Sequence, residues 1–214
     1  MNLNDFNFID YPVRFFGGRS RAKSGAPLIK DVSRKRKLKV MDKVLSLLPD
    51  TESYYYFGSH GFNIESKSNF KDAQLGYRVH PDGNDLTGSN DGDWLPSWYT
   101  IGRDTTVGDP FFVDTSSESL PVYSAMHGQG SWDPELVSET FTGFLSSIQY
   151  LKDKSNQDEE LIEPDKNTIN DEDELENINK HILSLCGENS EFFWECFFEQ
   201  HQDWIIENED DDDD

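Results

Sequence analysis

Two short aromatic and β-branched runs, each closed by turn residues, constrain the fold of this chain most. Both lie within residues 94–148. Residues 98–101 are stopped by Gly102, and Pro110–Asp114 lies between a Gly-Asp pair and a Thr-Ser-Ser run. Apolar runs of this length between Gly, Asp and Ser are typical of strands joined by short turns. The segment therefore predicts two neighbouring strands of one sheet.

A third strand and a helix are predicted to follow. Residues 120–126 form a strand-like run with Pro121 near its start, where a missing N–H is best tolerated. Asp133-Pro134-Glu135 then offers an N-cap, a proline at the first helical position and an acid in the first turn. Apolar residues recur with helical spacing at Val137, Phe141, Phe144, Ile148 and Leu151. We expect a helix over residues 134–151 that covers the sheet.

The first half of the chain predicts a short helix, a strand and a polar loop. Residues 44–48 form a short apolar helix before Pro49, and residues 53–57 form a strand that ends at Gly58. Residues 82–93, DGNDLTGSNDGD, are rich in oxygen ligands, but their spacing does not fit an EF-hand. We expect solvated turns there and no metal site.

Charge is distributed in three blocks. The net charge is about +7 over residues 1–43, −10 over residues 44–152 and −20 over residues 153–214, within a total of −23. The basic run at residues 34–37 fits either nucleic acid or the acidic remainder of the same chain, and we favour the second. Gly and Ser make residues 1–40 loop-like, and Met41 resembles a natural start, so this arm is either an accessory segment or an upstream start.

The C-terminal third predicts a linker and two helices. Residues 153–170 are polar and acidic, as in a linker. Leu175, Ile178, Ile182 and Leu185 then follow a helical stripe, with Gly187 as a stop signal. The aromatic segment after it, EFFWECFFEQHQDWII, either folds back onto the core or forms a groove for a partner; we favour folding back.

Composition indicates the compartment. No apolar run approaches the roughly 18 residues that span a bilayer, and Asp5 and Asp10 interrupt any signal-peptide core. Cys186 and Cys196 are the only cysteines, and no Asn-x-Ser/Thr acceptor is present. We expect a cytoplasmic protein that does not engage membranes.

The sequence holds no complete catalytic motif. It lacks a Gly-x-Ser-x-Gly elbow, a phosphate-binding P-loop, a Cys-x-x-Cys pair and a His-Glu-x-x-His helix. His127-Gly128 resembles the start of a glycine-rich loop, but no nucleophile is identifiable for His127 to activate. We expect no catalytic residues and no cofactor.

The order of these motifs resembles the SUKH superfamily, which includes fungal cell-wall synthesis regulators and many bacterial immunity proteins. The resemblance covers about residues 54–151. It rests on Ile101-Gly102, Gly108-Asp109, Phe112-Val113-Asp114, Pro121-Val122-Tyr123 and the closing Phe141 and Phe144-Leu145. It implies an α+β domain with a bent, mainly antiparallel sheet and packed helices. The basic first 43 residues and the acidic C-terminal extension are not part of the common core.

The resemblance also implies a function in binding. Bacterial members often neutralise a toxin, commonly a basic nuclease or deaminase, and an acidic inhibitor would associate quickly with such a partner. We therefore expect a non-enzymatic immunity protein that binds a toxin stoichiometrically; the alternative is an intracellular scaffold or regulator like the fungal proteins. Direct nucleic-acid binding is not expected, and the oligomeric state is left open.

The predicted organisation has five parts: a basic arm (1–40), the α+β domain (41–152), an acidic linker (153–170), a helical pair (171–206) and an acidic tail (207–214). The predicted partner-binding residues all lie in the second part. They are Trp94, Asp104, Asp109, Asp114, Tyr123, His127 and Trp132.

Overall fold

The computed structural model describes residues 26–209. The chain divides into two units, Met1–Lys35 and Arg36–Asp214. Helix α1 (Ala26–Leu47) begins in the first unit and ends in the second. Residues 26–40 are therefore helical, which corrects the loop-like reading of the basic arm. After Gly25, residues 26–40 contain no glycine and a single serine, and the helix formers Lys, Arg and Leu dominate; residues 1–25 lie outside the described part.

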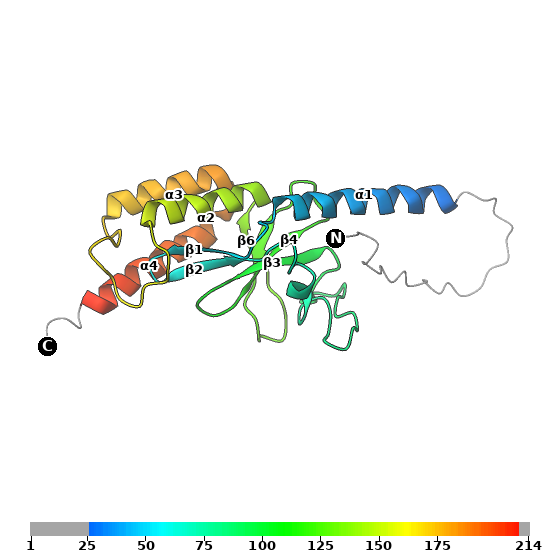
Figure 1. The fold of residues 1–214 in the computed structure, drawn as a ribbon, viewed down its shortest axis with the longest axis horizontal. Coiled ribbons are helices and arrows are strands. Elements are labelled where there is room, and N and C mark those ends of the chain that lie inside the picture. The colour runs from blue at the N-terminus through cyan, green and yellow to red at the C-terminus, as the bar shows by residue number, and fades with distance from the viewer. Residues whose placement is uncertain (1–25, 210–214) are drawn as a thin grey trace. The chain divides into compact units, whose positions relative to one another are not determined.

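The second unit is an α+β fold built on a curled sheet of six strands (Figure 1). The strands are β1 (Ser53–Phe57), β2 (His60–Ile64), β3 (Trp98–Asp104), β4 (Pro110–Asp114), β5 (Val122–Ser124) and β6 (Glu135–Ser138). They lie in chain order, and each pairs antiparallel with the next. The prediction of an antiparallel sheet with packed helices is confirmed.

Strand β3 does not stop at Gly102 as expected but continues to Asp104. The register shifts between Thr100 and Gly102, which is the signature of a β-bulge. A Cβ at Gly102 would collide with the carbonyl oxygen of Asn63 on β2. This glycine therefore permits close strand approach within the sheet and does not end the strand.

The predicted helix over residues 134–151 starts too early. Residues 135–138 form strand β6, and α2 spans Phe141–Ser155. The true N-cap is Thr140, whose Oγ1 accepts a hydrogen bond from the Gly143 N–H at 3.0 Å. Pairing with β5 therefore overrides the local Asp-Pro-Glu signal, although the apolar stripe from Phe141 to Leu151 is buried as predicted.

The aromatic C-terminal segment folds back onto the sheet, as favoured from the sequence. Helix α3 (Glu172–Cys186) is capped by Asp171 and ends at Gly187, and α4 (Glu191–Glu209) follows a short 3-10 turn, Glu188–Ser190. Trp194 of α4 is fully buried and donates its Nε1–H to the Val137 carbonyl at 3.0 Å. The helical pair is thus part of the core of the second unit.

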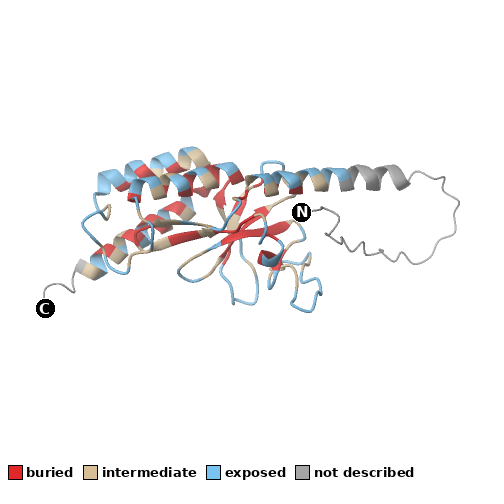
Figure 2. Cartoon of the chain, in the orientation of Figure 1, coloured by how far each residue is buried: buried red, intermediate tan, exposed pale blue. Residues whose placement is uncertain are grey.

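Both faces of the sheet are covered, and β4 shows how. Phe111 packs against Phe62 and Phe144 on the helix side, with ring centroids 5.4 and 5.2 Å away. Its neighbour Phe112 faces the opposite way and packs against Trp94 and Trp98. Successive side chains of a strand point to opposite faces, which explains why Phe111 and Phe112 pack on different sides. Because both faces are covered, the central strands are buried along most of their length (Figure 2).

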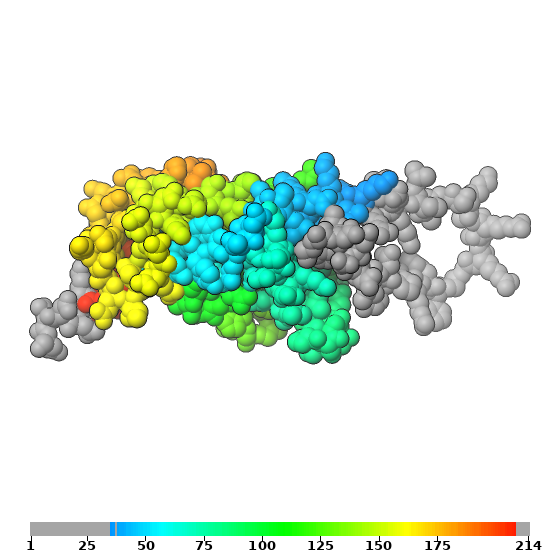
Figure 3. Space-filling model, in the orientation of Figure 1, coloured from blue at the N-terminus to red at the C-terminus, as the bar shows by residue number. Residues whose placement is uncertain are grey.

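Residues 156–171 pack against the β1–β2 turn and are tethered to it at several points. Gly58 donates its N–H to the Gln157 side chain at 2.7 Å, and its carbonyl accepts the Leu161 N–H at 3.0 Å. Trp204 on α4 donates to the Ile162 carbonyl at 3.0 Å. Figure 3 shows residues 156–171 in yellow beside the cyan β1–β2 hairpin. Helix α2 therefore includes the first three residues of the expected linker, 153–155, and the rest of the segment is held in place by these hydrogen bonds.

The polar loop of residues 82–93 is organised by its own carboxylates. Asp82 accepts the Asn84 N–H, Asp85 accepts the Thr87 N–H and Asp93 accepts the Asn90 N–H, at 2.8 to 3.0 Å. Residues 26–209 contain no cluster of side chains able to hold a metal ion. Within the same residues, no helix is both long and apolar enough to cross a bilayer.

Candidate partner-binding groove

A groove of about 860 Å³ lies where strands β2 to β6 meet helix α4. Its floor and wall include the largely buried rings of Phe62, Phe111 and Phe197. Four carboxylate side chains also line it: Asp104, Asp109, Asp133 and Glu135. None of the described lining residues is a lysine or an arginine. The groove is therefore acidic and partly apolar.

Asp104 organises the β3–β4 turn at one side of the groove. Its carboxylate accepts backbone N–H groups of Thr106, Val107, Gly108 and Asp109, at 2.6 to 3.3 Å. A carboxylate that accepts several amide N–H groups is already compensated within the protein. Asp104 thus fixes the loop, and its carboxylate oxygens are already occupied by hydrogen bonds within the protein.

Asp109 is engaged with His127 across the β3–β4 and β5–β6 connections. Its Oδ1 accepts the His127 backbone N–H at 2.8 Å and lies 2.7 Å from the ring Nδ1. The His127 side chain is about half exposed, 54%. The contact orients the imidazole at the edge of the groove and ties the two loops together.

Asp133 and Glu135 differ from the other two acids because the described residues give them no hydrogen-bonding or ion-pair partner. Burial raises the pKa of Glu135, and the neighbouring Asp133 carboxylate adds to the effect. On α4, burial raises the pKa of the Cys196 thiol, helped by Glu199, Glu135 and Glu195. Cys196 is therefore kept as a thiol, which makes it a poor nucleophile. This side of the groove carries uncompensated negative charge.

Part of the groove lining is apolar and exposed. Val107 of the β3–β4 turn is 61% exposed, and Met126, which follows β5, is 63% exposed. Both line the groove, together with half-buried Phe193 of α4. Exposed large apolar side chains beside a concave surface are typical of recognition sites.

His60 at the start of β2 is the one basic-type side chain among the described groove-lining residues. Burial lowers its pKa to about 4, and the nearby His201 contributes. Its Nε2 is buried without a hydrogen-bond partner in the described part of the chain. His60 is therefore neutral near pH 7 and does not offset the groove's negative charge.

The structure brings only some of the predicted partner-binding residues together. Asp104 and Asp109 line the groove, and His127 stands at its edge. Asp114 lies at the far end of β4, where it accepts the Ser116 N–H at 2.8 Å. Trp94, Tyr123 and Trp132 lie in the cluster on the other face of the sheet, where Trp94 is only 2% exposed.

Sequence reasoning missed Asp133, Glu135, Val107, Met126 and Phe193 as groove residues. Asp133 and Glu135 are predicted as the N-cap and first turn of a helix, whereas Glu135 begins β6 and Asp133 lies just before it. Val107 and Met126 belong to the β3–β4 and β5–β6 connections, and Phe193 reaches the groove because α4 returns to the sheet. A correct prediction of strand β6 could have pointed to these residues, because it places exposed apolar side chains and unpaired acids in neighbouring segments.

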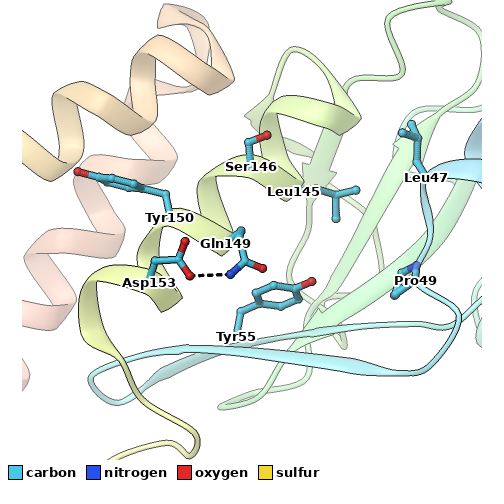
Figure 4. A pocket seen from close by; sticks show the side chains of 8 residues that line it. All are labelled: Leu47, Pro49, Tyr55, Leu145, Ser146, Gln149, Tyr150 and Asp153. Atoms are coloured by element: carbon cyan, nitrogen blue, oxygen red, sulfur yellow. Dashed lines mark hydrogen bonds between the residues drawn. The ribbon is translucent and has the colours of Figure 1, made fainter.

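A second hollow, of about 480 Å³, lies between the end of α1, β1 and α2 (Figure 4). Leu47, Pro49, Tyr55 and Leu145 supply its apolar surface. Among its described lining residues, Asp153 alone is charged, and its carboxylate accepts a hydrogen bond from Gln149 at 2.8 Å. It offers less enclosure and no uncompensated charge.

Both edges of the sheet are occupied. At β1, the outward carbonyls of Tyr54 and Tyr56 accept hydrogen bonds from Lys152 and Ser155 of α2. At β6, the Val137 carbonyl accepts the Trp194 indole N–H. A partner strand cannot extend the sheet at these positions without displacing these contacts.

A scan against protein-family models finds no match to this chain, and searches of the curated proteins and of the solved structures find none either.

Proposed function

We propose that this chain is a non-enzymatic, cytoplasmic immunity protein that neutralises a basic toxin, of nuclease or deaminase type, by stoichiometric binding. The observation that carries the proposal is the groove, which combines carboxylates with exposed apolar side chains and has no lysine or arginine among its described lining residues. The resemblance of residues 54–151 to the SUKH superfamily points in the same direction.

The negative charge supports this proposal in two ways: it speeds association with a basic partner, and it complements a basic surface at contact. A net charge of −23 raises the encounter rate with a basic partner over distances of a Debye length. At contact, Asp133 and Glu135 gain cationic partners that the described residues do not provide. A toxin whose active cleft is cationic would be blocked by the same surface that attracts it.

The test is capture followed by reconstitution. The full chain is used as bait in cells of its own organism, and the captured protein is purified and titrated against it. We expect a basic partner whose enzymatic activity falls linearly and reaches zero at one equivalent. Several unrelated partners with unchanged activities would contradict neutralisation and favour a scaffold instead.

A further inference from the structure

We infer that the groove recognises a protruding segment with two chemically different sides: a lysine or arginine that meets Asp133 and Glu135, and an adjacent apolar side chain that meets Val107 and Met126. This inference deepens the proposed function and rests on it for the identity of the whole partner. It commits to the local chemistry of the segment that enters the groove.

The acidic side is assigned by what the four carboxylates already do. Asp104 accepts four backbone N–H groups, and Asp109 holds both the backbone and the ring of His127. Asp133 and Glu135 have no such partners among the described residues, and the raised pKa of Glu135 reflects an unfavourable carboxylate environment. A cation between them would relieve that cost, whereas one at Asp104 would compete with existing hydrogen bonds.

The apolar side is assigned by exposure. Val107 and Met126 leave 61% and 63% of their surfaces in water, although most large apolar side chains of the second unit are buried. Val107 is positioned by the turn that Asp104 holds, and Met126 precedes the residue that Asp109 holds. Two fixed loops therefore present exposed apolar side chains in the same groove as the free acids, and methionine adapts readily to a partner's shape.

We expect a protruding segment in the groove and not an added strand, because hydrogen bonds from helices already engage the sheet edges. The Tyr54, Tyr56 and Val137 carbonyls are all engaged by side chains of α2 and α4. A volume of about 860 Å³ accommodates a few side chains of a loop or helix and falls within the usual range of binding pockets.

Three acetylated and amidated pentapeptides test the inference with the isotope-labelled full chain. Gly-Arg-Leu-Arg-Gly carries both features, Gly-Arg-Gly-Arg-Gly lacks the apolar side chain, and Gly-Glu-Leu-Glu-Gly reverses the charge. We expect amide NMR shifts centred on Glu135 and Met126 with the first peptide. Affinity should fall about fivefold for the second, and the third should not bind.

Matched variants separate the groove from general charge. Asp133→Asn with Glu135→Gln should weaken binding of the first peptide about tenfold, and Met126→Ser about fivefold. The controls are Asp158→Asn with Glu163→Gln, which removes two exposed acids elsewhere, and Leu86→Ser, which removes an exposed apolar side chain. Equal losses in test and control variants would overturn the inference.

The same variants distinguish failure of this inference from failure of the proposed function. A captured toxin that the Asp133 and Glu135 variant still neutralises with full affinity would overturn the inference and leave neutralisation standing. Selective peptide binding in the groove, combined with a partner that keeps its activity, would support the inference and contradict neutralisation.

Discussion

The ring of His201 on α4 lies directly against the backbone of Gly58 at the β1–β2 turn. A Cβ built at Gly58 would stand 2.5 Å from His201 Nδ1 and 3.0 Å from Trp204 Cζ3, and Gly58 has φ +61°. The ring of Phe57 also packs on His201, with centroids 4.7 Å apart. The C-terminal helix therefore approaches the hairpin at a distance that only glycine permits.

Gly58→Ala should lower the free energy of unfolding by about 2–4 kcal/mol. The left-handed backbone and the collision with His201 each contribute. Gly83→Ala is the control, because Gly83 also has positive φ but no heavy atom lies within 4 Å of its Cβ position. Denaturant titration of both variants measures the difference. Equal losses would mean that α4 does not lie against the hairpin.

Two histidines whose pKa values are lowered by burial predict a loss of stability in acid. The pKa of His60 is lowered to about 4 and that of His201 is lowered by burial, whereas an unfolded histidine titrates near 6.5. As pH falls from about 6.5 to about 4, the unfolded chain binds a proton at His60, whereas the folded chain does not. Stability is therefore full above this window and falls within it, by up to about 3 kcal/mol for His60.

His60→Gln should flatten this part of the pH profile, because it removes the proton uptake by the unfolded state. Unfolding free energies measured at half-unit steps between pH 7 and 4 give the comparison. A pH dependence of stability as steep in His60→Gln as in the parent chain would contradict a neutral His60 in the folded state.

Phe141→Ala should destabilise the protein by about 3–5 kcal/mol through a core cavity. Phe141 begins α2 and is fully buried, as the helical stripe predicts. Ser146→Ala, on the exposed face of the same helix, should change stability by less than about 0.5 kcal/mol. Thermal and denaturant unfolding measure both, and an unchanged Phe141→Ala midpoint would remove α2 from the core.

The parts of the fold that local patterns determine were predictable. Pro110–Asp114 has the predicted bounds, and Gly187 follows the end of α3 as its stop signal predicts. The failures occur where tertiary pairing decides. Residues 135–138 carry a good helix-start signal but complete the sheet beside β5, and Gly102 looks like a stop but lies at a bulge. His60–Ile64 was missed because glycine and asparagine interrupt its alternation.

The groove was less predictable than the fold. Asp104 and Asp109 are among the predicted partner-binding residues, but both carboxylates are engaged by internal hydrogen bonds. Trp94 and Trp132 are also predicted to bind a partner, but they pack in the cluster on the other face of the sheet. Which acids remain free depends on where every nearby N–H points, and that is a property of the folded chain.

Asp104→Ala should destabilise the β3–β4 turn by about 2–3 kcal/mol, since four backbone N–H groups lose a charged acceptor. Asp114→Ala is the matched control at the next turn, where the carboxylate accepts one N–H, and should cost about 1 kcal/mol. Amide hydrogen exchange at Val107 and Gly108 reports the loop directly. Unchanged exchange there would contradict the role assigned to Asp104.

Association with the captured partner should be fast and should slow steeply with salt. The net charge of −23 acts over a Debye length of about 8 Å at physiological ionic strength, and this range shrinks to about 3 Å at 1 M salt. Deleting residues 210–214, which lie outside the described part, should slow association only slightly. Glu135→Lys should also speed dissociation, because Glu135 lies in the groove itself. Stopped-flow kinetics at low and high salt measure both rates, and a salt-independent association rate or an acidic partner would remove the electrostatic basis for neutralisation.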